Sequence, residues 1–452
     1  MNKTVPVFLN SFLLPAVLLL ASCSMQKRIG RLVNENILQD SLFRNAHTGI
    51  SIYDPAREQY IYNYNAEKYF IPASNVKIVT CYAGMKYLGD SLAGIKFAEN
   101  DTAVFLYPSG DPTFLHPDFP VQPVVTFLKQ ADKRLYVSDA NWKAEALGSG
   151  WSWDDYNDYY MPERSALPVY GNVIRWMQSI NKKENPQYAG DTLDNFIYSE
   201  PEINWEVKFA PAEPSGSFSV KREKDENIFT ISEGKTAFSR KDVPFVTKGL
   251  QSALELLRDT VHKELIYLPR FQTSNFKLQI VSSQPADSLL KPMMHNSDNF
   301  FAEQILLMVS NQLLEVMNDA KVIDTLLASE LKGFPQKPRW ADGSGLSRYN
   351  LFTPQDFVWL LDKMKKEFSW ERLKTIFPTG GTGTLYNYYK QDSSFIYAKT
   401  GSLSGVVALS GYLITEKNKT LIFSILVNNH QSNPVLIRRK TEELLKYIKM
   451  HY

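Results

Sequence analysis

The sequence predicts an α+β fold in which strands from both ends of the chain share one antiparallel sheet, helices flank that sheet, and a large insert interrupts the domain. Three observations predict it: two β-rich runs near the N-terminus, three more in the last third, and helical periodicity between them. The 452 residues are 44% hydrophobic, so the chain can bury a core for more than one domain and is not a disordered protein.

Charge and cysteine content exclude several classes of function. Fifty Lys and Arg residues against forty-eight Asp and Glu give a net charge of +2, which is too balanced for the footprint of a nucleic-acid-binding protein. Two cysteines and six histidines favour neither a disulfide framework nor a Cys-rich or His-ligated metal site. We therefore expect no nucleic-acid partner and no metal.

Residues 1–22 have the pattern of a secretory signal peptide, since an apolar run from Val5 to Leu20 ends in small residues before Cys23. The run is too short and too broken for the about 20 apolar residues of a membrane span. Because the small residues resemble a bacterial lipobox, we expect Cys23 to be lipidated. That lipid would tether the exported chain through residues 23–45 to a membrane facing the periplasm, the outer membrane being favoured. The alternative is an ordinary signal peptide with an incidental cysteine.

The first folded elements are predicted to be a hairpin and a buried helix. Residues 48–53 and 59–64 are β-rich runs on either side of a turn that contains a proline. From Pro72 to Leu88 apolar residues recur at helical spacing, with proline at the start and Gly89 placed as a C-cap.

An insert is predicted next, because residues 94–242 change to short β-like and irregular runs rich in aromatic residues, Pro and Gly. Helical periodicity returns at 245–261 and 299–316. The last strands are expected at 394–400, 406–414 and 420–428. The main domain would thus comprise residues 46–93 and 243–452.

The start of the first helix carries a candidate nucleophile and base, Ser74 and Lys77. Residues three apart share a helical face, so the Lys77 amine can reach the Ser74 hydroxyl and take its proton, provided that its pKa is lowered. The spacing alone is weak, because it recurs elsewhere, for example at Ser288 and Lys291. Ser74 differs from the other serines with this spacing in its sequence context, because Pro72 precedes it and an apolar helix follows it.

Two further motifs lie downstream, each with a structural alternative. Ser297-Asp298-Asn299 opens the second core helix, where a hydroxyl can relay protons and an amide can hold a lysine, or where the segment is simply an N-cap. Lys399-Thr400-Gly401 ends a β-run, where it suits binding of a carboxylate, or is a β-bulge with a solvated lysine.

Ser-x-x-Lys, Ser-x-Asn and Lys-Thr-Gly in this order are the set found in penicillin-binding proteins and serine β-lactamases. The chain further resembles the class C penicillin-binding proteins, which are D-alanyl-D-alanine carboxypeptidases and endopeptidases. The resemblance rests on the long separation of Ser74 from Ser297 and on four segments of the sequence: 109–113, 150–155, 340–350 and 398–403. It implies a β-lactamase/penicillin-binding-type domain with a five-stranded antiparallel sheet and a large inserted domain after the helix of Ser74.

The resemblance also implies the chemistry of the site. Ser74 is the acylated nucleophile and Lys77 the general base, while Ser297 and Asn299 assist proton transfer to the leaving group and position the substrate. The backbone N–H groups of Ser74 and Ser402 form the oxyanion hole. No metal or organic cofactor takes part.

For the substrate, the resemblance implies that Lys399 binds the terminal carboxylate of a peptidoglycan stem peptide, with Thr400 and Ser402 nearby, and that Asp155 in the insert holds the side-chain amine of diaminopimelate. β-Lactams would be trapped on Ser74. Two alternatives remain open: a peptidoglycan-binding lipoprotein without turnover, which the intact motifs disfavour, and a β-lactamase, for which no water-activating group can be identified.

Overall fold

The computed structural model describes residues 26–183, 192–271 and 277–452. The chain forms two compact units. The first unit contains the described residues up to Asn75 together with 334–339 and 350–452, and the second contains the described residues of 76–333 together with 340–349. The chain therefore passes from the first unit to the second between Asn75 and Val76.

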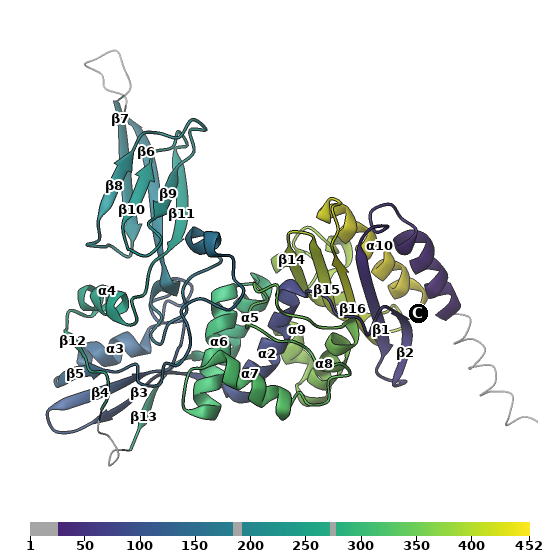
Figure 1. The fold of residues 1–452 in the computed structure, drawn as a ribbon, viewed down its shortest axis with the longest axis horizontal. Coiled ribbons are helices and arrows are strands. Elements are labelled where there is room, and N and C mark those ends of the chain that lie inside the picture. Colours follow the sequence, from purple (N-terminus) through teal and green to yellow (C-terminus); the bar gives the residue numbers. More distant parts are fainter. Residues whose placement is uncertain (1–25, 184–191, 272–276) are drawn as a thin grey trace, which may run out of the picture. The chain divides into compact units, whose positions relative to one another are not determined.

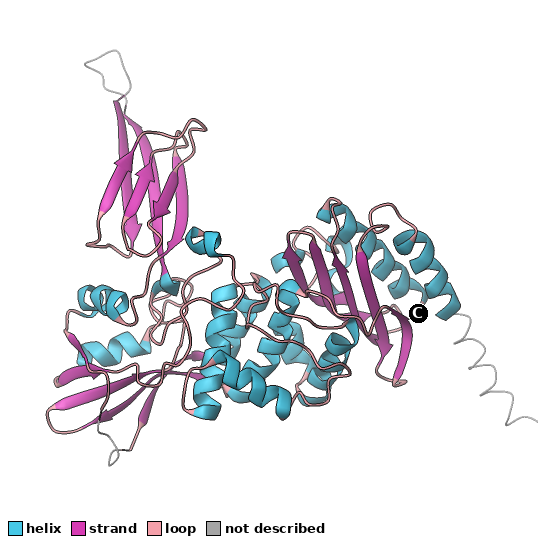
Figure 2. Ribbon diagram, viewed as in Figure 1, coloured by secondary structure: helices cyan, strands magenta, loops and turns pink. Residues whose placement is uncertain are grey.

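The first unit is built on a five-stranded antiparallel sheet, as predicted (Figures 1 and 2). Strands from the C-terminal part of the chain continue directly into the N-terminal hairpin. The order across the sheet is β14 (Ile396–Leu403), β15 (Val406–Ile414), β16 (Thr420–Asn428), β1 (His47–Asp54) and β2 (Gln59–Tyr64). Every neighbouring pair is antiparallel.

Helices cover both faces of this sheet. Leu413 lies in one apolar core with residues of α10 (Pro434–His451), whereas the hydroxyl of the adjacent Tyr412 donates to the carbonyl of Leu361 in α8 (Pro354–Glu367). Because consecutive strand residues point to opposite faces, α10 and α8 lie on opposite sides of the sheet. A short helix, α9 (Trp370–Ile376), completes the unit.

The N-terminal segment differs from the expected tether. Residues 26–33 are helical and continue into the turn η1 (Asn34–Leu38), which packs against α10. Ile29, Val33 and Ile37 are buried in the core of the first unit because their spacing of four residues places them on one helical face. The predicted signal peptide and Cys23 lie outside the described residues. Within the described ranges, no helix combines the length and the apolar character that crossing a bilayer requires.

The helical core of the second unit surrounds α2 (Val76–Tyr87), whose residues from Val76 to Met85 are all buried. α2 packs against α5 (Ala286–His295) and α6 (Asn299–Leu314), and α7 (Asp319–Ala328) packs against α6. Gly84 lets these helices approach, because a Cβ there would lie 2.8 Å from a methyl group of Leu290. A central helix buried on all sides agrees with its largely apolar sequence, in which Lys77 and Thr80 are buried polar exceptions.

The described residues of the insert form three sheets, which contribute to one apolar core. The first has the order β12 (Leu265–Tyr267), β5 (Arg134–Val137), β4 (Ala103–Pro108), β3 (Ser91–Glu99) and β13 (Gln279–Pro285). The second has the order β8 (Val207–Ala210), β10 (Phe229–Ser232) and β9 (Ser219–Arg222), and the third has β11 (Phe238–Pro244), β6 (Val173–Lys183) and β7 (Thr192–Glu200). Two helices accompany them, α3 (Pro123–Gln130) and α4 (Gln251–Val261).

The insert extends beyond the predicted end at residue 242. β13 pairs antiparallel with β3, and β12 pairs parallel with β5, so residues 265–285 belong to the sheet that opens the insert. The predicted helix at 245–261 exists as α4, but Leu256 and Leu257 pack into the insert core. The physical reason is that strand pairing between distant segments leaves no local periodicity in the sequence.

Candidate active site

Ser74 sits on a strained turn of the first unit, η2 (Ala73–Asn75), just before α2. Its side chain is partly exposed, although Pro72, Ala73 and Asn75 around it are buried. Ala73 has φ 47°, a left-handed conformation that costs free energy for a residue with a Cβ and persists only where the surroundings impose it. The turn thus leaves Ser74 partly exposed within an otherwise buried segment.

Asn75 fixes this turn to the sheet of the first unit. Its side-chain Nδ2 donates to Ser410 Oγ on β15 at 2.7 Å, and Ser410 Oγ in turn donates to Ser424 Oγ on β16 at 2.8 Å. All three side chains are buried, where hydrogen bonds are worth more than in water. The position of Ser74 is therefore set by the residue that follows it.

The Lys-Thr-Gly segment lies on β14, beside the turn of Ser74. A Cβ on Gly401 would be 2.7 Å from the carbonyl oxygen of Pro72 and 3.2 Å from Cβ of Ala73, so only glycine lets the strand pass this close. Lys399 is fully buried, and its Nζ donates to the carbonyl of Thr400 at 2.9 Å. The pairing of β14 with β15 is uninterrupted. The alternative of a β-bulge with a solvated lysine is therefore wrong.

Ser402 is exposed at the end of the same strand. Arg438 on α10 donates from Nη2 to Ser402 Oγ at 2.6 Å. Sequence reasoning did not single out Arg438, because nothing local in a surface arginine of a C-terminal helix indicates which strand it meets. Arg438 adds a positive charge beside Ser402.

Lys77 is buried in the second unit, on the first turn of α2. Its Nζ donates to Asn299 Oδ1 and to the carbonyl oxygen of Ser344, each at 2.7 Å. Burial lowers the pKa of Lys77 to about 8, although the carboxylates of Asp342, Asp298 and Glu303 act in the opposite direction. A buried amine favours its neutral form, which is the form that can accept a proton.

The Ser297-Asp298-Asn299 segment combines both interpretations of its motif. The side chain of Asp298 is the N-cap of α6 and accepts from the backbone N–H of Phe301 at 2.8 Å. The next residue, Asn299, receives the ammonium of Lys77 and donates from Nδ2 to the carbonyl of Tyr160 at 3.0 Å. Ser297 precedes them with φ 59°. Asp298 thus caps the helix, whereas Asn299 contacts Lys77.

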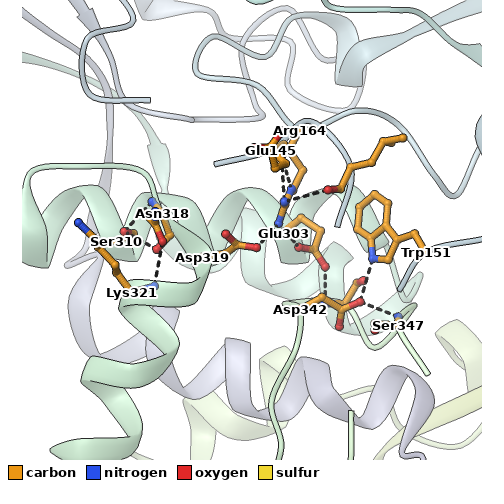
Figure 3. A network of polar contacts seen from close by, with 12 residues as sticks. Glu145, Trp151, Arg164, Glu303, Ser310, Asn318, Asp319, Lys321, Asp342 and Ser347 are labelled. Atoms are coloured by element: carbon orange, nitrogen blue, oxygen red, sulfur yellow. Dashed lines mark hydrogen bonds and ion pairs between the residues drawn. The ribbon is translucent and has the colours of Figure 1, made fainter. Parts of the chain in front are cut away.

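The loop 340–349 supplies the second acceptor for Lys77 and is held by buried groups. Asp342 accepts from the backbone N–H groups of Gly345 and Ser347, at 2.8 and 2.6 Å, and from Nε1 of Trp151 at 3.0 Å (Figure 3). The backbone N–H of Ser344 donates to Glu303 Oε1 at 2.7 Å. Asp342 thereby closes a buried polar turn over residues 342–347.

Asp155 lies on η3 (Trp153–Asn157), a short helix of the insert, and is partly exposed. Burial, together with Asp158 and Asp155, raises the pKa of the nearby Tyr160 well above its usual range. An accessible carboxylate is the group that recognition of an amine requires, and its role toward diaminopimelate stays a prediction.

Sequence reasoning missed the groups that surround Lys77 in the second unit. The carbonyl of Ser344 gives no signal, because any residue carries one. Glu303 does give a weak signal, since it is the one charged side chain in the apolar run from Phe300 to Val309. In the parts of the chain that the structure describes, no group of three or more His, Cys, Asp or Glu side chains could hold a metal ion.

Comparison with known proteins gives concordant results. Residues 33–446 match the model of the D-Ala-D-Ala carboxypeptidase 3 (S13) family. A D-alanyl-D-alanine carboxypeptidase of an Actinomadura species is 26% identical, over 93% of this chain and 86% of the relative. D-alanyl-D-alanine carboxypeptidase DacB of Haemophilus influenzae is 23% identical, over 92% of each chain. The crystal structure of penicillin-binding protein 4 (dacB) from Haemophilus influenzae matches with a TM-score of 0.71 and 18% identity, over 93% of this chain and 98% of that one.

Proposed function

The chain belongs to the D-Ala-D-Ala carboxypeptidase 3 (S13) family and is a penicillin-binding serine carboxypeptidase, and we propose that it acts through an acyl-enzyme on Ser74. Its substrates are peptidoglycan stem peptides, and β-lactams bind in their place. We further propose that it cleaves crosslinks as an endopeptidase, because a crosslink presents the same D-Ala carbonyl with a larger amine as leaving group.

The observation that carries this proposal is the state of Lys77. Its amine is fully buried, has its pKa lowered to about 8, and donates to two neutral acceptors, an amide oxygen and a backbone carbonyl. Such an amine can become neutral near physiological pH and take the proton of a hydroxyl. Ser74 is three residues earlier in the sequence, on the turn that leads into the helix of Lys77.

The reaction begins when Ser74 Oγ attacks the carbonyl carbon of the penultimate D-Ala and its proton passes to Lys77 Nζ. The backbone N–H groups of Ser74 and Ser402 stabilise the oxyanion of the tetrahedral intermediate. Collapse breaks the peptide C–N bond, and the leaving amine takes a proton with the help of Ser297, while Asn299 positions the substrate. Water then attacks the ester, which releases the peptide and restores the Ser74 hydroxyl.

Substrate binding is assigned to the β14 segment and to the insert. Lys399 carries a buried positive charge that attracts the terminal carboxylate of the stem peptide, and the Thr400 and Ser402 hydroxyls lie on the same strand. Asp155 provides a negative charge for the side-chain amine of diaminopimelate. These roles are supported by the family resemblance and by the charge of each group.

We also propose that the protein is a lipoprotein exported to the periplasm and anchored through Cys23, with the outer membrane favoured. The sequence of the first 23 residues supports this, as described above. The test is membrane fractionation of wild type and Cys23→Ala, with globomycin treatment as the processing control. The wild type should sediment with membranes and the variant should not, whereas a wild type found free of membranes would reject the anchor.

The acyl-enzyme is tested by labelling the purified protein with a fluorescent penicillin and measuring intact mass. We expect one adduct on wild type and none on Ser74→Ala, together with a loss of D-Ala release from a D-Ala-D-Ala pentapeptide on the order of 10³-fold or more. Ser288→Ala is a matched control, since Ser288 and Lys291 share the spacing without the setting. An adduct that persists on a folded Ser74→Ala variant would contradict the assignment.

A further inference from the structure

A chain of buried polar contacts joins the insert to Lys77. It begins at Arg164 of the insert, whose side chain is 1% exposed. Arg164 Nη1 contacts Glu303 Oε2 on α6 at 3.3 Å and Asp319 Oδ2 on α7 at 2.7 Å (Figure 3). Its remaining N–H groups donate to the backbone carbonyls of Glu145 and Leu147. The guanidinium is thereby fixed from several directions.

Glu303 continues this chain through its second oxygen. Its side chain is 0% exposed, and Oε1 accepts from the backbone N–H of Ser344 at 2.7 Å. The carbonyl of Ser344 itself accepts from Lys77 Nζ at 2.7 Å. Both backbone polar groups of Ser344 are therefore in use: its N–H donates to Glu303, and its carbonyl accepts from Lys77.

We propose that Glu303, held in place by Arg164 of the insert, is a positioning residue for the general base Lys77. It fixes Ser344, whose carbonyl orients the Lys77 amine, and its carboxylate adds a negative charge to the surroundings of that amine. The proposal rests on the proposed function, since it takes Lys77 to be the base. It gives the insert a part in assembling the catalytic lysine in addition to contacting the substrate.

The ion pair with Arg164 alone does not explain why Glu303 is buried. Arg164 already has Asp319 as a nearer carboxylate, which is 17% exposed and so less costly to ionise. Burying a second carboxylate carries a desolvation penalty, and apolar residues often replace buried ion pairs without loss of stability. Glu303 does, however, satisfy the buried N–H of Ser344, which no apolar side chain could do.

The charges around Lys77 and Glu303 determine in which direction a change at Glu303 shifts the pKa of Lys77. Lys77 is faced by Asp342 of the loop, by Asp298 and Glu303 of α6, and all three raise its pKa against the effect of burial. Burial and Asp342 raise the pKa of Glu303 to about 7, while Arg164 and a hydrogen bond with the Ser344 side chain act against them, and Asp319 adds a smaller upward effect. Removing the charge of Glu303 should therefore lower the pKa of Lys77.

The experiment compares two isosteric variants, Glu303→Gln and Asp319→Asn, which each remove one carboxylate that contacts Arg164. The second-order rate constant of acylation by a fluorescent penicillin is measured across pH 6 to 10, with melting temperatures as the folding check. Glu303→Gln should lower the high-pH plateau at least tenfold and move the midpoint of the rising limb to lower pH. Asp319→Asn should keep the wild-type midpoint and a plateau within twofold.

Two further variants keep the outcome decisive. The double variant Arg164→Met/Glu303→Gln removes both charges of the Arg164–Glu303 contact and leaves only the partly exposed Asp319 without its ion pair. It should show the same shift of the rising limb if Glu303→Gln alone folds poorly. A wild-type plateau and midpoint in a folded Glu303 variant would overturn the proposal. Lys77→Ala tests the proposed function separately from the role of Glu303. If this variant is acylated like wild type, Lys77 is not the base and the proposed function fails as well.

Discussion

At Lys77, burial and neighbouring charges act on one ammonium group in opposite directions. Burial prevails and lowers its pKa to about 8, while Asp342, Asp298 and Glu303 limit the shift. The direction in which activity changes with pH follows from this pKa. A base must be neutral, so the reactive fraction of Lys77 is small below pH 8 and grows as pH rises through that value.

We therefore predict that the rate constant of penicillin acylation rises with pH and levels off, with a midpoint near 8. Lys77→Arg should reduce the plateau by roughly 10² to 10⁴, because arginine keeps the positive charge and does not release its proton. The measurement is stopped-flow or gel-based labelling at constant ionic strength. A flat profile in wild type, or full activity in a folded Lys77→Arg variant, would exclude lysine as the base.

At the scale of elements, the strands of the main sheet and the helices α2 and α6 could be predicted because each has its own periodicity or turn signal. The hairpin β1–β2, the helix α6 and the strands β15 and β16 were all predicted from such patterns. The site motifs were found for the same reason, as residues at fixed spacing on these elements. The contact between Glu303 and Arg164 could not be predicted in this way, because the two residues lie far apart in the sequence.

Two glycines on different elements should respond in opposite ways to the same substitution. A Cβ on Gly401 would lie 2.7 Å from a backbone oxygen, so Gly401→Ala should destabilise the protein by about 1–3 kcal/mol and slow acylation by displacing the turn of Ser74.

A Cβ on Gly30, in the helix at 26–33, would meet nothing closer than 3.6 Å. Gly30→Ala should therefore stabilise by up to about 1 kcal/mol and leave acylation unchanged. Thermal melts and labelling rates of both variants decide the matter, and a Gly401→Ala variant that equals wild type in both would refute the close approach.

At the scale of the whole molecule, each of the two units is built from segments that are far apart in the sequence. The first unit joins residues from both ends of the chain, and the insert continues to β13 because that strand pairs with β3. Sequence reasoning ended the insert at residue 242, since pairing between strands so far apart leaves no trace in local periodicity. For the same reason it assigned residues 26–38 to a tether, although their apolar face packs against α10.

The folded N-terminal helix has a consequence for where the enzyme can work. Cys23 precedes Gln26, the first residue of the described N-terminal helix, by three positions in the sequence, and a chain spans at most about 3.6 Å per residue. If Cys23 carries the lipid, the chain between the lipid and the folded helix spans at most about 11 Å. A fully extended tether of residues 23–45 would span at most about 80 Å. The enzyme would then reach only the peptidoglycan nearest to the membrane that holds the lipid. A flexible linker inserted after Cys23 should allow it to cleave peptidoglycan farther from that membrane.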